Sequence, residues 1–353
     1  MTKRVLILMS ILWIVLSPML LLANMARKAD FDGDGSVGFG DFLEFAGAYS
    51  TSQVKYDLDG SGTVDFPDFL AFASVFGQSV SSTIINVEDA NIIKDSIYSP
   101  AFDKHAIAHN IVIVAFPDVT DGFLTNVANI LHKILQKDAA TDDARRDLLL
   151  DNFLKNKFLQ RVGSVGPENY ADPGFDEIPG FNKVNDEHEV VDFIWELELN
   201  EEVKGKTQAQ RDAQQVNEIV EHLLHTITNG FNKTFNSWEY QNQSSALNLA
   251  MAEAINGKYY DVQSYEEIRA RGDVEGYQKI IVQEFIYWVI LTGWDLKTPY
   301  KPNTSPEWYV EDSQELQTKL PLAYKLFTDE VSGVLVNPTQ MYLDNLIFES
   351  IVD

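Results

Sequence analysis

The chain has 353 residues, enough for two domains or for one large domain with a small appendage. Hydrophobic residues make up 45% of it and aromatic residues 12%, a composition that excludes a largely disordered protein. The formal charge of −26 argues against nucleic acid as a partner, and the absence of cysteine excludes disulfide bonds and thiolate metal sites. Any metal is therefore held by oxygen or imidazole ligands.

Residues 1–26 have the order of a secretory signal peptide. Lys3 and Arg4 precede an almost wholly apolar run that ends at Leu22, and Ala23 or Ala26 is a small residue suited to cleavage. Because the run approaches the length of about 20 residues that spans a bilayer, an uncleaved membrane anchor is the alternative. Both interpretations place the remainder outside the cytoplasm, so we expect a secreted protein that contacts membrane only if the segment is retained.

An internal repeat follows the signal segment. Two twelve-residue segments that begin at Asp30 and Asp57, 27 residues apart, share one pattern. Each has oxygen-bearing side chains at positions 1, 3, 5 and 12, glycine at position 6 and an aliphatic residue at position 8. This spacing is typical of the EF-hand calcium loop, with aspartate in place of the usual glutamate at position 12.

A helix is predicted after each loop. Both copies carry apolar residues at the same helical spacing, namely Phe39, Phe42, Leu43, Ala46 and Tyr49 in the first and Phe66, Phe69, Leu70, Ala73 and Phe76 in the second. Neither helix can bury such a stripe alone. We therefore expect the two stripes to face each other across a pseudo-twofold axis.

The duplicated half EF-hand at residues 28–79 resembles the type I dockerin modules of extracellular bacterial enzymes. The resemblance implies two calcium ions and a cohesin-like partner that attaches enzymes, often polysaccharide-degrading ones, to a scaffold or cell surface. It implies calcium ligation by Asp30, Asp32, Asp34, Ser36 and Asp41 in one loop and by Asp57, Asp59, Ser61, Thr63 and Asp68 in the other. Loop positions 10 and 11, polar in cohesin-binding dockerins, are Phe39-Gly40 and Phe66-Pro67 here. The alternative is a spacer that binds calcium only in order to fold.

After a polar linker at residues 80–90, residues 91–353 are predicted to form a large domain. One buried strand is expected within Ile111–Phe116 and a long surface loop over 162–188. Helices are predicted from about Gly122, from Thr141, over Lys206–Thr228 before Gly230, over Ser245–Asn256, over Asp273–Leu291, and from Ser305-Pro306-Glu307. The predicted fold is mainly α, with a small EF-hand-like helical module followed by a large α-rich (α+β) domain.

One predicted helix carries titratable residues on a single stripe. Glu218, Glu221, His222 and His225 lie together, opposite the apolar side. Glu221 with His225, and Glu218 with His222, have the i, i+4 spacing by which a helix presents two ligands to zinc. The segment is faintly similar to the zincin metallopeptidase helix His-Glu-x-x-His, but its order is Glu221-His222-x-x-His225. The alternative is a solvated polar face.

Glu284 lies in the apolar run Ile280–Leu291, where Gln283 is the only other residue that is neither aliphatic nor aromatic. A buried glutamate needs a partner. A metal shared with Glu221 and His225 is one candidate, and protonation or a buried Lys or Arg are the others.

The metal hypothesis gives the large domain a candidate site. Glu221, His225 and Glu284 would ligate zinc or a similar ion, and Glu218 and His222 would be the catalytic pair that orients the ligands or accepts a proton. Glu253 is a weaker ligand candidate. The other histidines, His105, His109, His132 and His188, are isolated in the sequence and are expected to be structural.

These features together predict a secreted calcium-binding protein, in which a dockerin-like module is joined to a divergent metal-dependent hydrolase, most plausibly a peptidase. The alternatives are a non-catalytic extracellular surface or assembly protein and an accessory protein of a polysaccharide-degrading complex.

Overall fold

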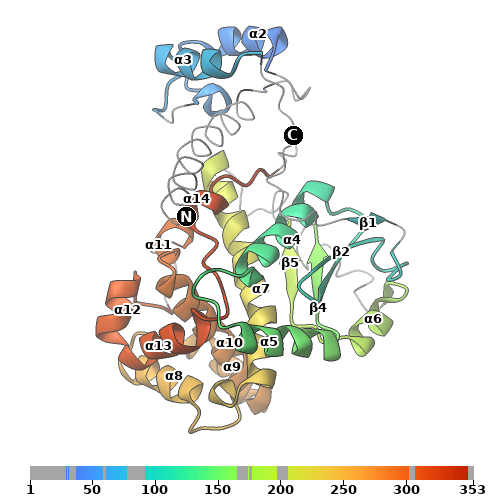
Figure 1. The fold of residues 1–353 in the computed structure, drawn as a ribbon, viewed down its shortest axis with the longest axis vertical. Coiled ribbons are helices and arrows are strands. Elements are labelled where there is room, and N and C mark those ends of the chain that lie inside the picture. The colour runs from blue at the N-terminus through green and yellow to red at the C-terminus, as the bar shows by residue number, and fades with distance from the viewer. Residues whose placement is uncertain are drawn as a thin grey trace, which may run out of the picture. The chain divides into compact units, whose positions relative to one another are not determined.

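The computed structural model describes residues 29, 31, 37–58, 61–77, 92–94, 96–164, 174, 177–196, 206–301 and 307–348. The chain divides into two compact units, Met1–Glu88 and Asp89–Asp353, called here the small and the large unit. Helices predominate, and the described part of the large unit adds a mixed sheet (Figure 1), so the prediction of a mainly α chain with an α+β large domain is confirmed. The predicted signal segment 1–26, the linker 80–90 and the loop residues Asp30, Asp32, Asp34, Ser36 and Asp59 lie outside the described residues. Within the described ranges, every helix is too short or too polar to cross a bilayer.

The small unit is built on the repeat. Its two main helices are α2 (Phe39–Ala48) and α3 (Phe66–Val75). The rings of Phe45 and Phe72, equivalent positions of the two copies, stack with centroids 5.5 Å apart. Two crossed contacts, Phe42 with Phe72 and Phe45 with Phe69, have nearly equal centroid distances of 6.3 and 6.4 Å. The helices therefore face each other with the pseudo-twofold relation that the repeat predicts.

The prediction of which side of each helix is buried is wrong: the buried residues form a line next to the predicted one on the helix surface. The fully buried aromatic residues are Phe45 and Phe72, whereas the large side chains left exposed are Phe39, Leu43, Tyr49, Phe66, Leu70 and Phe76. Each helix has two adjacent apolar rows, and the ring of Phe31 from the first loop stacks on both Phe45 and Phe72. Burial of Phe31 therefore selects the row of Phe45 and leaves the other row in solvent.

The large unit contains a five-stranded sheet in the order β1-β2-β3-β4-β5. The strands are β1 (Ile93–Lys94), β2 (Lys104–Ala108), β3 (Ile111–Ala115), β4 (Leu159–Gly163) and β5 (Phe193–Trp195). The first three pair antiparallel and the last three parallel. His109 and Asn110, with φ of 47° and 69°, form the two-residue turn between β2 and β3. The sequence predicts only β3, because β1 and β5 have two and three residues and because β2 and β4 bury polar residues such as Lys104 and Gln160.

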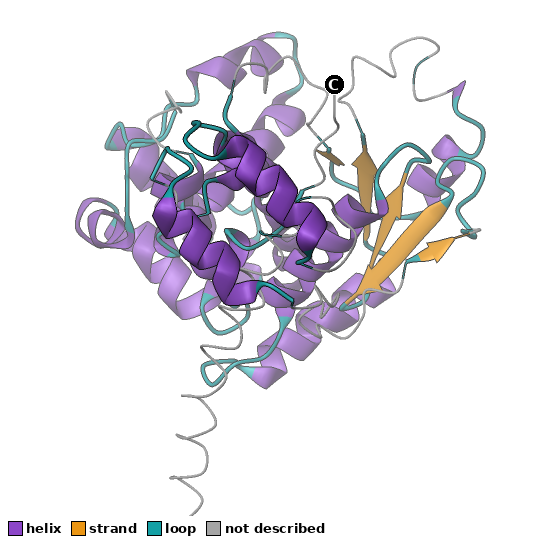
Figure 2. Ribbon diagram, turned by 90° about the horizontal axis from the view of Figure 1, so that it is seen from above, coloured by secondary structure: helices purple, strands orange, loops and turns teal. Residues whose placement is uncertain are grey.

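Helices make up the rest of the large unit. They are α4 (Asp121–Leu135), α5 (Asp143–Lys155), α6 (Phe181–Glu187), α7 (Gln208–Thr234), α8 (Ala246–Asn256), α9 (Glu266–Ala270), α10 (Val274–Gly293), α11 (Lys297–Tyr300), α12 (Ser313–Lys319), α13 (Pro321–Leu326) and α14 (Gln340–Leu343). Figure 2 shows the strands gathered at one side of the large unit. Both α4 and α7 contact the sheet and each other, and α10 contacts α7.

Two predicted helix boundaries and one predicted loop are corrected. Helix α7 continues past Gly230, where a Cβ atom would lie 2.3 Å from Cε1 of Phe153, so this glycine serves the close approach of α5. Helix α6 lies inside the predicted loop 162–188. Glu307 precedes an isolated bridge between Tyr260 and Trp308 instead of starting a helix, and α12 begins at Ser313.

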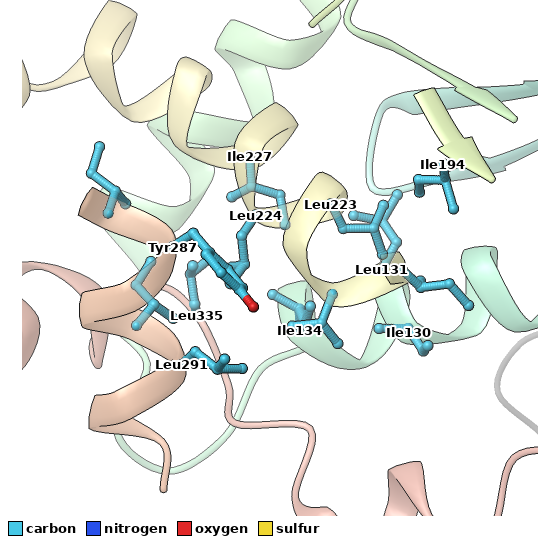
Figure 3. Close-up of a cluster of buried hydrophobic side chains, with 14 of the residues drawn as sticks. Ile130, Leu131, Ile134, Ile194, Leu223, Leu224, Ile227, Tyr287, Leu291 and Leu335 are labelled. Carbon is cyan, nitrogen blue, oxygen red and sulfur yellow. The ribbon is translucent and has the colours of Figure 1, made fainter. Parts of the chain in front are cut away.

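The apolar side of α7 lies at the centre of the core. Figure 3 shows Leu223, Leu224 and Ile227 of α7 between side chains of α4 and α10. All three are 0% exposed. This packing fixes the rotation of α7, and its opposite stripe is thereby directed toward β5 and α10.

The segment 333–348 returns to the first part of the large unit. The backbone N–H of Val336 donates to the carbonyl of Ile134 at 2.8 Å, and the side chain of Asn126 donates to the carbonyl of Ile347 at 2.7 Å. Phe348 packs on Phe123. Helix α4 is thus covered by residues that lie more than 200 positions later in the sequence.

Candidate functional site

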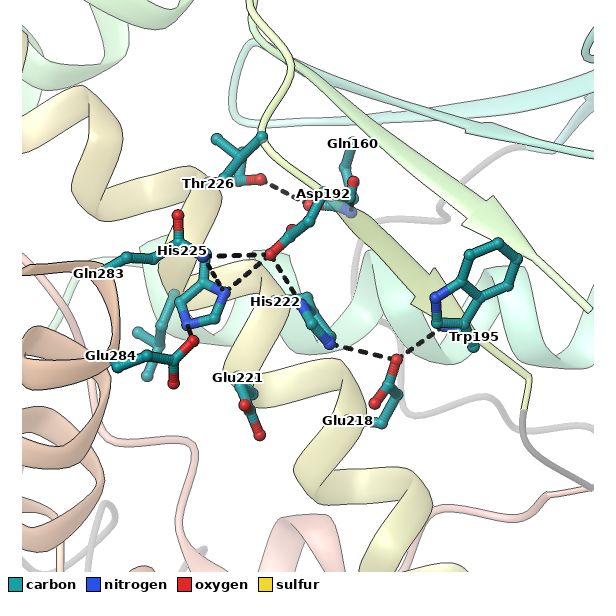
Figure 4. A network of polar contacts seen from close by, with 12 residues as sticks. Gln160, Asp192, Trp195, Glu218, Glu221, His222, His225, Thr226, Gln283 and Glu284 are labelled. Carbon is teal, nitrogen blue, oxygen red and sulfur yellow. Dashed lines mark hydrogen bonds and ion pairs between the residues drawn. The ribbon is translucent and has the colours of Figure 1, made fainter. Parts of the chain in front are cut away.

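The polar stripe of α7 is largely shielded from solvent. The side chains of Glu218, Glu221 and His222 are 15%, 16% and 21% exposed, and that of His225 is 1% exposed. The alternative of a solvated polar face is therefore wrong. The stripe faces the segment before β5 on one side and α10 on the other (Figure 4).

Asp192, immediately before β5, joins the two histidines. Its Oδ2 atom lies 2.9 Å from Nδ1 of His222 and 2.8 Å from Nδ1 of His225 (Figure 4). Burial raises the pKa of the Asp192 carboxyl, but the two imidazoles outweigh burial and hold the pKa well below its usual range. An ionised Asp192 accepts hydrogen bonds from both Nδ1 atoms, which leaves each Nε2 directed away from it.

His222 is held between two carboxylates. Its Nε2 lies 3.3 Å from Oε1 of Glu218, and the same oxygen accepts the backbone N–H of Trp195 at 3.0 Å. Burial lowers the pKa of His222, but Asp192 and Glu218 raise it well above the usual 6.5. This chain of contacts ties α7 to β5.

His225 presents an unpaired nitrogen to α10. Its Nε2 is buried without a hydrogen-bond partner and lies 3.7 Å from Oε1 of Glu284. Glu221, His225 and Glu284 each offer one ligand atom, and these atoms lie within 4.8 Å of one another. The three residues that the sequence nominated as ligands are therefore adjacent.

Glu284 has no basic side chain as a partner in the described ranges other than His225. Burial, with the charges of Glu221 and Glu307, raises the pKa of Glu284 to about 7, although His225 opposes the shift. Lys301 pairs with Glu221 at 3.4 Å, and no lysine or arginine of the described ranges lies within ion-pair distance of Glu284. A buried lysine or arginine partner for Glu284 is thus absent there.

Two carboxylates and one imidazole suit a small transition-metal cation, which takes three protein ligands and leaves an open position at catalytic sites. The second grouping, Asp192 with His222 and His225, also has the composition of a metal site. Its Nδ1 atoms, however, already bond to Asp192, which is the arrangement of an outer carboxylate that orients ligating histidines.

A cleft of about 400 Å³ lies beside the site, between α7 and α10. His225 and Gln283 form part of its wall. Val282 and Ile286 of its lining are buried. Of Glu221, His225 and Glu284, only His225 lines this cleft.

Two residues of the network were missed from the sequence and one was misplaced. In the sequence, Asp192 is only an acidic residue before a short strand. Gln283 is only a polar residue in an apolar run, but its Nε2 lies 2.9 Å from Nδ1 of His225. Glu253, the weaker ligand candidate, lies elsewhere and accepts the backbone N–H of Leu322 at 2.9 Å.

In the small unit, the described loop residues are engaged with the backbone. Asp41 and Asp68 are 0% exposed. Asp41 accepts the N–H groups of Phe31 and Gly38, and Asp68 accepts those of Leu58 and Asp65.

The described residues of the second loop gather around Asp57. Asp57 accepts the N–H groups of Ser61 and Gly62 at 3.1 and 2.7 Å, and the hydroxyl of Ser61 donates to the carbonyl of Thr63. Gly62, at loop position 6, has a φ of +92°, which explains why glycine occurs there.

No protein-family model, curated protein or solved structure matches this chain.

Proposed function

We propose that the large unit is a metal-dependent hydrolase, peptidase-like in its helix motif, with Glu221, His225 and Glu284 as the ligands. One observation carries this proposal. The buried Nε2 of His225 has no hydrogen-bond partner and points at Glu284, a carboxylate without a lysine or arginine partner in the described ranges. A cation between them would satisfy both groups and Glu221 at once.

The chain's own residues divide into ligands and orienting groups. When bound, a zinc-type cation lowers the pKa of a coordinated water to about 7 and polarises a carbonyl oxygen. Asp192 fixes the ring of His225 through Nδ1, so that Nε2 is the nitrogen left for ligation. His222 and Glu218 are orienting groups. Both ring nitrogens of His222 contact carboxylates, Nδ1 that of Asp192 and Nε2 that of Glu218, so His222 has no nitrogen left to bind a metal.

Metal analysis of the full chain tests this proposal. The protein, purified without chelator, should carry near one zinc or similar ion per chain, and His225→Ala and Glu284→Gln should each lose it. Glu253→Gln is the matched control and should keep the ion. A wild-type chain without stoichiometric metal, with a destabilised Glu284→Ala and a near-normal His225→Ala, would instead support a purely structural buried network.

A second candidate function belongs to the small unit, which we propose to be a dockerin-like, calcium-dependent attachment module of a secreted protein. The repeat exposes equivalent large apolar side chains twice, Phe39 with Phe66 and Leu43 with Leu70. Exposed apolar patches of this kind mark interaction surfaces. A cohesin-like protein is the proposed partner, which would bring the large unit to an extracellular assembly such as a polysaccharide-degrading complex.

Calcium titration and pull-down test the module. Isothermal titration of the full chain should find two calcium sites that disappear in Asp30→Ala/Asp57→Ala. The immobilised chain should capture a cohesin-like protein only with calcium present, and Leu43→Glu/Leu70→Glu should abolish capture without abolishing calcium binding. Calcium binding without capture would favour a spacer.

Secretion is tested separately: N-terminal sequencing should show that the mature protein begins between Asn24 and Lys28.

A further inference from the structure

A buried relay lies behind the Glu221 carboxylate. The hydroxyl of Tyr287 on α10 donates to Oδ1 of Asn217 at 2.7 Å, and Nδ2 of Asn217 donates to Oε2 of Glu221 at 2.8 Å. Tyr287 and Asn217 are 0% and 4% exposed, so water does not compete for these bonds. Neither Tyr287 nor Asn217 is a proposed ligand, but Asn217 bonds directly to the ligand Glu221.

The relay fixes which way the Asn217 amide points. An amide offers an acceptor at one end and donors at the other. Because Tyr287 donates to the oxygen end, the nitrogen end must face Glu221, where a flipped amide would set two oxygens against each other. The same oxygen of Glu221, Oε2, also lies 3.4 Å from Nζ of Lys301. Oε2 is therefore occupied by two donors, and Oε1 remains.

We propose that Tyr287 and Asn217 are positioning residues that keep one oxygen of Glu221 out of the coordination sphere, so that the large-unit site takes a zinc-type cation and rejects calcium. This inference rests on the metal site proposed above. Calcium requires six to eight oxygen ligands, whereas zinc is satisfied by four ligands of mixed nitrogen and oxygen type. Because Oε2 of Glu221 is withheld, Glu221 gives one oxygen and Glu284 at most two. The two carboxylates then supply three oxygens instead of four, which is further below the six to eight that calcium takes.

Selectivity for zinc over calcium matters in a chain that also has calcium-type loops. The loops of the small unit have the calcium pattern, so the protein is expected to work where calcium is plentiful. A large-unit site that accepted calcium would be filled by the wrong ion. Restricting Glu221 to a single oxygen strengthens the discrimination against calcium.

The test is zinc affinity of the full chain, measured by competition with a chromophoric chelator in millimolar calcium. Wild-type affinity should be unchanged by calcium. Tyr287→Phe, which keeps the ring and removes one hydroxyl, should bind zinc about 10- to 100-fold more weakly, as expected for an outer partner of a ligand. Asn217→Ala should show a similar or larger loss, because its amide bonds to Glu221 directly.

Tyr260→Phe is the matched control. Tyr260 is equally buried at 1% exposure, but its hydroxyl donates to the backbone carbonyl of Ile281, so zinc affinity should not change. Thermal unfolding of the zinc-free proteins reports any structural loss separately. Zinc affinity of Tyr287→Phe equal to wild type, or displacement of zinc by calcium, would overturn the inference and leave the metal site standing. A wild-type chain that binds no zinc would overturn the metal site itself.

Discussion

The two units of this chain hold their buried carboxylates in opposite ways. In the small unit, Asp41 and Asp68 accept backbone N–H groups that lie within ten residues of them in the sequence. In the large unit, Asp192, Glu221 and Glu284 come from three separate elements and meet only because the core packs α7 against β5 and α10. Local contacts specify the first arrangement, and tertiary packing specifies the second.

The cores differ in the same way. The centre of the small unit is a stack of Phe31, Phe45 and Phe72, whereas the core of the large unit extends across the sheet and most of its helices. A folded unit of about 50 residues buries a smaller fraction of its surface and is only marginally stable. Equivalent damage should therefore have unequal consequences.

The largest expected effect comes from removing one buried phenylalanine in each unit. Phe45→Ala and Phe153→Ala delete side chains that are 1% and 0% exposed, and each should cost about 3 to 5 kcal/mol of unfolding free energy. Phe45→Ala should unfold the small unit, while Phe153→Ala should leave the large unit folded with a lowered denaturation midpoint.

Fluorescence separates the two units once the predicted signal segment, which holds Trp13, has been removed. The other five tryptophans lie in the large unit, namely Trp195, Trp238, Trp288, Trp294 and Trp308. Phe45→Ala should reduce helical circular dichroism without changing the fluorescence transition. Coupled loss of both signals in Phe45→Ala would contradict independent units.

Two glycine-to-alanine substitutions, one in each unit, should change the unfolding free energy by less and in opposite directions. Gly230→Ala places a methyl group 2.3 Å from the ring of Phe153, and overpacking of this kind should destabilise the large unit by about 1 to 3 kcal/mol. Gly47→Ala, in α2, meets no atom within 4 Å and should stabilise the small unit by up to about 1 kcal/mol through helix propensity. Chemical denaturation of both variants checks this, and equal signs would disprove the packing argument.

A pH dependence is expected in the large unit alone, and near neutral pH its effect on stability is the smallest of the three. The ring of His109 stacks on His132 with centroids 4.7 Å apart, and Nδ1 lies 3.1 Å from Nη2 of Arg146. Burial, then the neighbouring His132 and Arg146, lower the pKa of His109 to about 4. Between pH 6.5 and 4 the unfolded chain therefore binds a proton that the native unit does not. Stability from His109 is complete above pH 6.5 and is lost as the pH falls, by at most about 1.4 kcal/mol per pH unit.

The variant His109→Asn isolates this group. Asparagine tolerates the positive φ of 47°, so the turn is kept while the titration is removed. The acid loss of stability, followed by tryptophan fluorescence, should become shallower than in wild type. An unchanged slope would show that His109 remains protonated in the native state.

Sequence reasoning succeeded where spacing alone determines geometry. Glu221 and His225 share a helix face at i, i+4, and an acid in an apolar run, Glu284, had to find a partner. It failed where a choice depends on another segment. The two apolar rows of α2 are equivalent until Phe31 occupies one of them. His109 and His132, expected to be isolated, meet because a turn and a helix 23 residues apart are packed together. Asp192 and the pairing of Tyr287 with Asn217 depend on contacts between elements, which no periodicity records.

The packing of residues 333–348 over α4 also determines when α4 can be covered during synthesis. A ribosome makes α4 long before it makes the segment that covers Phe123 and Asn126. During that interval the apolar surface of α4 that Phe348 covers is exposed. A nascent chain of this kind presents that surface to chaperones until residues 333–348 have been made.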